Sequence, residues 1–123
     1  MAQVSFRLLS YLFLIAVVIQ FFLAGLGTLG GESIDAHRDW GFIVMHLLPL
    51  LMFGAAIWAS MGKITITMVV LLFVLVLIQT FFADEGLDPM WIRSLHVLNG
   101  LAIFVLAHHI AQRSGPLRAV ATT

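Results

Sequence analysis

Two stretches of the sequence decide the fold, Ala36-His37-Arg38-Asp39-Trp40-Gly41 and Leu95-His96-Val97-Leu98-Asn99-Gly100. In each, a histidine is followed four residues later by a glycine, which in a helix lies one turn further along on the same face. The match continues upstream, where residues 19–24 read IQFFLA and residues 78–83 read IQTFFA. All matched positions lie 59 residues apart without a gap, as His37 and His96 do. We interpret the chain as one helical hairpin written twice, with repeats at approximately 4–60 and 63–119.

The composition indicates an integral membrane protein. Of 123 residues, 62% are hydrophobic and 10% are charged, and the mean hydropathy is +1.10. A chain of this length and polarity suffices for about four bilayer crossings. The formal net charge is zero, so a basic surface for nucleic acid is not expected. There is no cysteine, which excludes disulfides, thiolate metal sites and covalent attachment of haem through cysteine.

Four apolar runs follow one another along the chain, and each is at least as long as the ~20 residues that a helix needs to cross hydrocarbon. They cover Val4–Leu29, Ser33–Ser60, Ile64–Ala83 and Pro89–Gln112. The connections between them are short, which favours antiparallel neighbours. The sequence therefore predicts an all-α membrane protein, an up-down-up-down four-helix transmembrane bundle that forms a single domain over residues 1–123.

The charges predict an orientation. The predicted helices place all six acids at one end of the bundle, together with Arg38 and Arg93, and the other four basic residues at the opposite end. Because cytoplasmic ends carry an excess of Lys and Arg, both termini are expected in the cytoplasm. The expected location is the bacterial inner membrane. Both histidine motifs then lie near the outer face.

A histidine among apolar helices is costly and by default marks a site or a satisfied hydrogen bond. Two neutral imidazoles from opposite sides can complete the coordination of haem iron without a covalent link to the porphyrin. We therefore predict that His37 and His96 are the axial ligands of one haem b. Gly41 and Gly100 would leave space for the macrocycle, and the guanidinium groups of Arg38 and Arg93 would pair with its propionates.

The arrangement resembles small membrane b-type cytochromes, namely the cytochrome b561 group and each four-helix half of haem A synthase. In these proteins histidines on bundle helices hold haem b, which implies electron transfer here. The segments QFFLAGLG at 20–27, AHR at 36–38 and LHVLNG at 95–100 also resemble an uncharacterised family of short four-span bacterial proteins. That second likeness covers nearly the whole chain and implies no activity.

Other polar residues leave alternatives open. His46 could pair with His96 in place of His37, or could bond a quinone, a water or another helix. It could also hold a second haem with His109 or with a non-histidine ligand such as Met52. Gln20 and Gln79 occupy matched positions nearer mid-membrane, where they either lock helices together or contact a cofactor. Without a cofactor, His37 would be an interfacial cap and His96 a bond between helices.

Two function classes follow. The first is a haem b electron-transfer protein, linked to quinol or acting as a small subunit of a respiratory or photosynthetic complex. Its expected partners are the lipid membrane, the haem, a quinone and subunits of the larger complex. The second is a cofactor-free membrane subunit or small transporter whose histidines are structural or carry protons. A stand-alone enzyme is the weaker interpretation, since no hydrolytic constellation or phosphate-binding loop is present.

Overall fold

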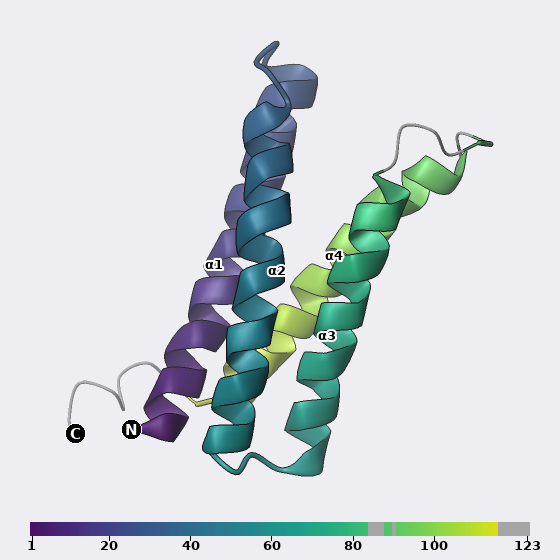
Figure 1. Cartoon of the computed structure of the whole chain (residues 1–123). Helices are drawn as coiled ribbons and strands as arrows, with labels where there is room; N and C mark the ends of the chain where they lie inside the picture. Colours follow the sequence, from purple (N-terminus) through teal and green to yellow (C-terminus); the bar gives the residue numbers. More distant parts are fainter. Residues whose placement is uncertain (84–87, 90, 116–123) are drawn as a thin grey trace.

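The chain forms four long helices, as seen in a computed structural model that describes residues 1–83, 88–89 and 91–115. In chain order they are α1 (Ala2–Leu29), α2 (Asp35–Trp58), α3 (Lys63–Phe82) and α4 (Trp91–Arg113) (Figure 1). The residues described form no strand, so the predicted all-helical class is confirmed. All four helices are long and apolar enough to cross a membrane, which supports a multi-pass membrane protein.

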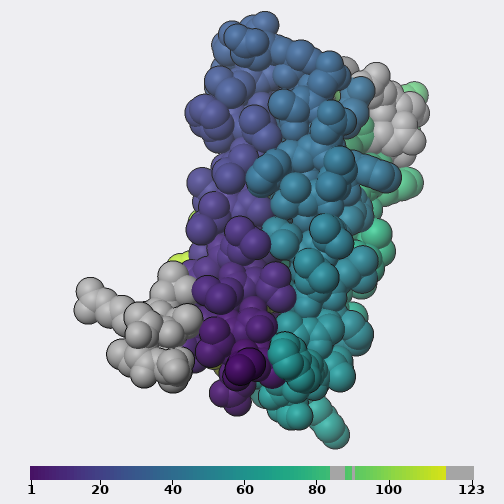
Figure 2. Space-filling model, turned by 60° about the vertical axis from the view of Figure 1, so that its left-hand side comes forward, coloured from purple at the N-terminus to yellow at the C-terminus, as the bar shows by residue number. Residues whose placement is uncertain are grey.

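Each helix packs against two neighbours. α1 contacts α2 and α4, and α3 contacts α4 and α2. Figure 1 shows consecutive helices running in opposite directions, with the start of α1 and the end of α4 at the same end of the molecule. Figure 2 shows α1 and α2 side by side along their length. The molecule is thus two helical hairpins, α1–α2 and α3–α4, laid against each other.

The buried core lies in the half of the bundle that holds the start of α1. Its largest fully buried side chains come from all four helices: Phe6, Phe13, Met52, Leu72 and Ile110. Toward the other end this core stops at Val17, Met45, Val76 and Gly100, and no side chain that the structure describes beyond those levels is buried. In Figure 1 the two hairpins diverge toward that end. Both histidine motifs therefore lie where the hairpins are least tightly packed.

At the packed end, hydrogen bonds join α1 to the end of α4. Arg7 donates from Nε to the carbonyl oxygen of Ser114 at 2.7 Å, and the hydroxyl of Tyr11 donates to the carbonyl of Gly115 at 3.4 Å. The last carbonyls of a helix have no partner within the helix and carry partial negative charge, which favours a cation there. These bonds hold the two hairpins together at the end away from the histidine motifs.

Candidate functional site

His37 of α2 and His96 of α4 lie against each other across the bundle in an edge contact. Their ring centroids are 6.1 Å apart and their planes cross at 63°. Both side chains are half-buried. Each belongs to a different hairpin, so the two rings meet between the hairpins, just beyond the end of the packed core.

Each ring is anchored to the other helix of its own hairpin. Nδ1 of His37 lies 3.1 Å from the carbonyl oxygen of Gln20, and Nδ1 of His96 lies 3.2 Å from the carbonyl oxygen of Gln79. Because a carbonyl oxygen can only accept, each Nδ1 must carry the proton and donate it. In a neutral imidazole this fixes the tautomer and leaves the lone pair on Nε2.

Each glutamine side chain also donates a hydrogen bond to the backbone carbonyl of the histidine that donates to the glutamine's own backbone carbonyl. Gln20 donates from Nε2 to the carbonyl of His37 at 3.1 Å, and Gln79 donates from Nε2 to the carbonyl of His96 at 2.9 Å. Nε2 of Gln20 also lies 3.3 Å from Nε2 of His37, which accepts in the tautomer above. Each hairpin therefore carries the same reciprocal glutamine–histidine lock.

A third pair of bonds repeats at the same spacing, although sequence analysis assigned no role to its donors. The indole of Trp40 donates to the carbonyl of Ala16 at 3.1 Å, and the amide of Asn99 donates to the carbonyl of Leu75 at 2.8 Å. Trp40 and Asn99 are 59 residues apart, as Ala16 and Leu75 are. The common offset was the signal that could have found them.

The two locks differ in one bond. An amide nitrogen has two hydrogens, and Asn99 uses the second to donate to Oε1 of Gln79 at 2.6 Å. The indole of Trp40 has only one. Oε1 of Gln20 is buried and has no hydrogen-bond partner among the residues described. The lock of the first hairpin thus contains an unsatisfied acceptor that the second hairpin satisfies.

The two glycines make room for the glutamine amides. A Cβ at Gly41 would lie 2.7 Å from Nε2 of Gln20, and a Cβ at Gly100 would lie 3.3 Å from Nε2 of Gln79 and 3.6 Å from the ring of Phe21. The space that sequence analysis reserved for a macrocycle is thus taken by side chains of α1 and α3 in this structure.

His46 lies outside the pair. Its Nδ1 donates to the carbonyl of Phe42 at 2.9 Å, and its Nε2 lies 3.1 Å from the hydroxyl of Thr80, so it links α2 to α3. Of the alternatives for His46, the structure displays the bond to another helix. The imidazole ring in contact with His96 belongs to His37.

The remaining candidates are spread over the surface. Arg38 and Arg93 are exposed, and Arg38 lies 4.0 Å from the carboxylate of Asp35. His108 stacks on Phe104 and is exposed, as is His109, which lines a groove between α3 and α4. Within residues 1–83, 88–89 and 91–115 no three His, Cys, Asp or Glu side chains gather as a metal site would require.

Residues 20–85 match DUF6220, a family of unknown function, and this range is more than half of the chain. The chain belongs to the DUF6220 family. The matched range contains Gln20, His37 and Gln79 and ends before His96. No curated protein and no solved structure matches this DUF6220 chain. The resemblance to cytochrome b561 and haem A synthase is therefore an analogy of architecture, and no relationship to either supports it.

Proposed function

We propose that this protein binds one haem b between His37 and His96 and transfers electrons within the membrane. The observation that carries the proposal is the spacing of the two rings. Bonds from a metal to imidazole nitrogen are about 2 Å long, so two imidazoles that bind one ion in line have centroids about 6 Å apart. The centroids of His37 and His96 are 6.1 Å apart.

The tautomers support the same role. Histidines that bind metals usually donate their second ring nitrogen to a carbonyl or carboxylate, which orients the ring and increases its basicity. His37 and His96 have this partner in the backbone carbonyls of Gln20 and Gln79. Iron ligation through Nε2 would cost His37 only its contact with the Gln20 amide.

The position of the histidine pair suits a porphyrin. A porphyrin held between the two rings would lie between the hairpins, at the end where the described side chains form no buried core. Separating the hairpins there would break the edge contact of Phe21 with Phe104 at 6.4 Å and the bond of His46 to Thr80 at 3.1 Å. Arg38 and Arg93 begin the same helices as the histidines and would reach propionates directed toward the aqueous surface.

The ligand set favours electron transfer over bond-making chemistry. When bound, haem supplies a one-electron redox couple, and two histidine ligands leave no open coordination position for a substrate. The chain's own residues hold the two imidazoles and fix their tautomers. We place the protein in the bacterial inner membrane with both termini cytoplasmic, as a quinol-linked carrier or a small subunit of a larger complex. A single haem near one face cannot by itself carry electrons across the ~30 Å hydrocarbon layer.

The experiment is a visible and electron paramagnetic resonance spectrum of the full chain, purified from cells supplied with a haem precursor. We expect about one haem per chain with a low-spin bis-imidazole signature. His37→Ala and His96→Ala should each abolish that signature, whereas His46→Ala and His108→Ala are matched controls that should keep it. Loss with His46→Ala but not with His37→Ala would assign the ligand to His46 instead.

A second outcome distinguishes the competing function. Reciprocal bonding also suits a cofactor-free subunit, since both rings and the nitrogens of both glutamine amides already have partners within the protein. A colourless protein, purified under conditions that supply haem, would favour that class. For a coloured protein, stopped-flow reduction by a short-chain quinol tests the link to quinol, and failure to reduce would leave a partner protein as the donor.

A further inference from the structure

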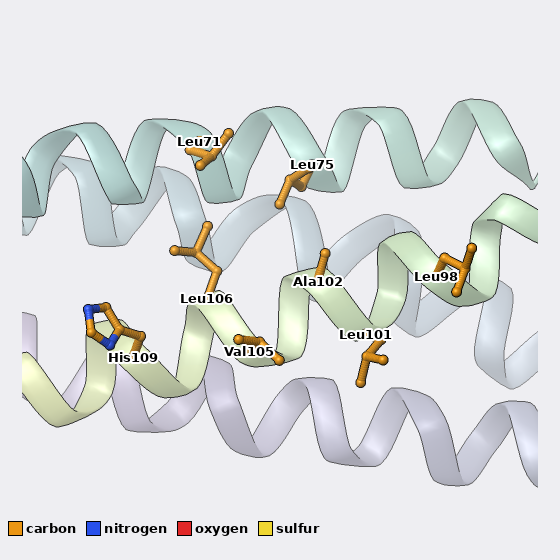
Figure 3. Close-up of a pocket in the computed structure, with 8 residues that line it drawn as sticks. All are labelled: Leu71, Leu75, Leu98, Leu101, Ala102, Val105, Leu106 and His109. Atoms are coloured by element: carbon orange, nitrogen blue, oxygen red, sulfur yellow. The ribbon is translucent and has the colours of Figure 1, made fainter.

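An apolar groove runs along the outer face of the second hairpin, away from the histidine pair. Its volume is about 660 Å³, and the groove is open to the surface. Figure 3 shows leucines of α3 on one side and a stripe of α4 that includes Leu98, Ala102, Val105 and His109 on the other. His109 is the only polar side chain among the lining residues.

The groove has the length of a lipid chain in one leaflet. Leu98 and His109 are eleven residues apart on α4, about 16 Å at 1.5 Å per residue. Half of the ~30 Å hydrocarbon layer is about the same length. The imidazole at one end of the groove can donate a hydrogen bond to an ester or phosphate oxygen.

The charge at that end favours an anion. Arg113 follows His109 by four residues, one turn further along the same stripe, and Lys63 begins α3 at the same end of the molecule. Both side chains are exposed. The acids that the structure describes, Glu32, Asp35, Asp39 and Asp88, lie in or beside the helix ends at the opposite end.

We infer that this groove binds one acyl chain of an anionic phospholipid, with the headgroup at His109 and Arg113. Basic sites between transmembrane helices select anionic headgroups, and each cation near the surface favours an anionic lipid by a factor of about five. The site is independent of the haem proposal. The matched positions of the first hairpin do not favour such a site, because Ile43 stands where the groove has Ala102 and Leu50 where it has His109.

The test is native mass spectrometry of the full chain in detergent with equimolar phosphatidylglycerol and phosphatidylcholine of the same chain length. We expect one retained lipid, enriched about fivefold or more in phosphatidylglycerol. Arg113→Gln should reduce the enrichment about fivefold, and Ala102→Phe should remove the lipid by filling the groove. Two control variants make the same kinds of change outside the groove, Arg93→Gln for the charge and Ile43→Phe for the volume. Both should leave lipid retention unchanged.

Four results would overturn the inference. Equal retention of the two lipids would make the groove an ordinary lipid-facing surface. Retention unaffected by Ala102→Phe would place the lipid elsewhere. Displacement of the lipid by equimolar ubiquinone, or dimerisation that Ala102→Phe abolishes, would assign the groove to a neutral quinone or to a second copy. Circular dichroism of each variant verifies that the helices are intact.

Discussion

The imidazole rings of His37 and His96 make an edge contact with their centroids 6.1 Å apart, although each ring is anchored within a different hairpin. The ligands of the proposed haem are therefore oriented before any haem binds, each by a carbonyl of its own hairpin. A group bound by both rings would connect the hairpins at the end that the packed core leaves open. Ligand binding and the stability of the bundle should accordingly be coupled.

The two glutamine locks should differ in stability. Gln79→Leu removes two bonds, the donation to His96 and the acceptance from Asn99, and interhelical bonds in membranes are worth about 0.6 kcal/mol each on average. Gln20→Leu also removes bonds to His37, but it removes the buried unpaired Oε1 too. We expect Gln79→Leu to cost about 1 kcal/mol more than Gln20→Leu.

Unfolding in mixed micelles by titration with dodecyl sulfate measures both free energies. Asn99→Leu provides a further comparison, since it removes the hydrogen bond to Oε1 of Gln79 and leaves that oxygen without a partner, like Oε1 of Gln20. Equal costs for the two glutamine variants would contradict the difference between the locks.

Much of this geometry was accessible from the sequence. The lengths of the apolar runs predicted four helices, and the structure begins and ends each within two residues of the prediction. The 59-residue offset indicated that His37 and His96 occupy matched positions. The offset could not indicate where the Gln20 amide lies, because the position of the amide depends on the rotamer that Gln20 adopts next to Gly41. Hence the glycines were assigned to a porphyrin face, while the structure places glutamine amides there.

The unpaired acceptor and the groove were missed for a related reason. The acceptor depends on one position at which the repeats differ, Trp40 against Asn99. The groove depends on two, Ile43 against Ala102 and Leu50 against His109. Matching the repeats draws attention to what they share. A donor count at the first position and a side-chain volume at the second would have revealed both features.

Replacing glycine by alanine should distinguish the crowded positions from the open ones. Alanine favours a helix over glycine by about 1 kcal/mol, and a Cβ at Gly25 or Gly54 would meet nothing within 4 Å. Gly54→Ala should therefore stabilise the protein by up to about 1 kcal/mol. Gly41→Ala should gain little, because its Cβ, 2.7 Å from Nε2 of Gln20, displaces the amide from His37.

The same micelle titration gives the ranking, with Gly100→Ala expected between the two because its Cβ contact of 3.3 Å is less severe. A Gly41→Ala variant as stable as Gly54→Ala would indicate that the amide moves aside without losing its bonds.

His46 and Thr80 should be energetically coupled across the hairpins. Thr80→Val and His46→Leu each remove the bond that joins α2 to α3 at 3.1 Å, so their effects should not add. A double-mutant cycle should give a coupling of about 0.6 kcal/mol. Thr67→Val, at an exposed threonine on the same helix, should show no coupling to His46→Leu. Additive effects of the first pair would mean that the bond contributes nothing measurable.

The orientation can be tested with reporter fusions that are active on one side of the membrane only. Three of the basic residues that the structure describes, Arg7, Lys63 and Arg113, lie at the end that holds the start of α1, so fusions after Gly62 and Thr123 should report the cytoplasm. A fusion after Gly31 or Gly86 should report the outside. Lys63→Glu is the informative variant, because it replaces a positive charge at the start of α3 with a negative one and should weaken the bias. Cytoplasmic signals at Gly31 and Gly86 would move the histidine pair to the inner face, where the electron donor would have to be a cytoplasmic one.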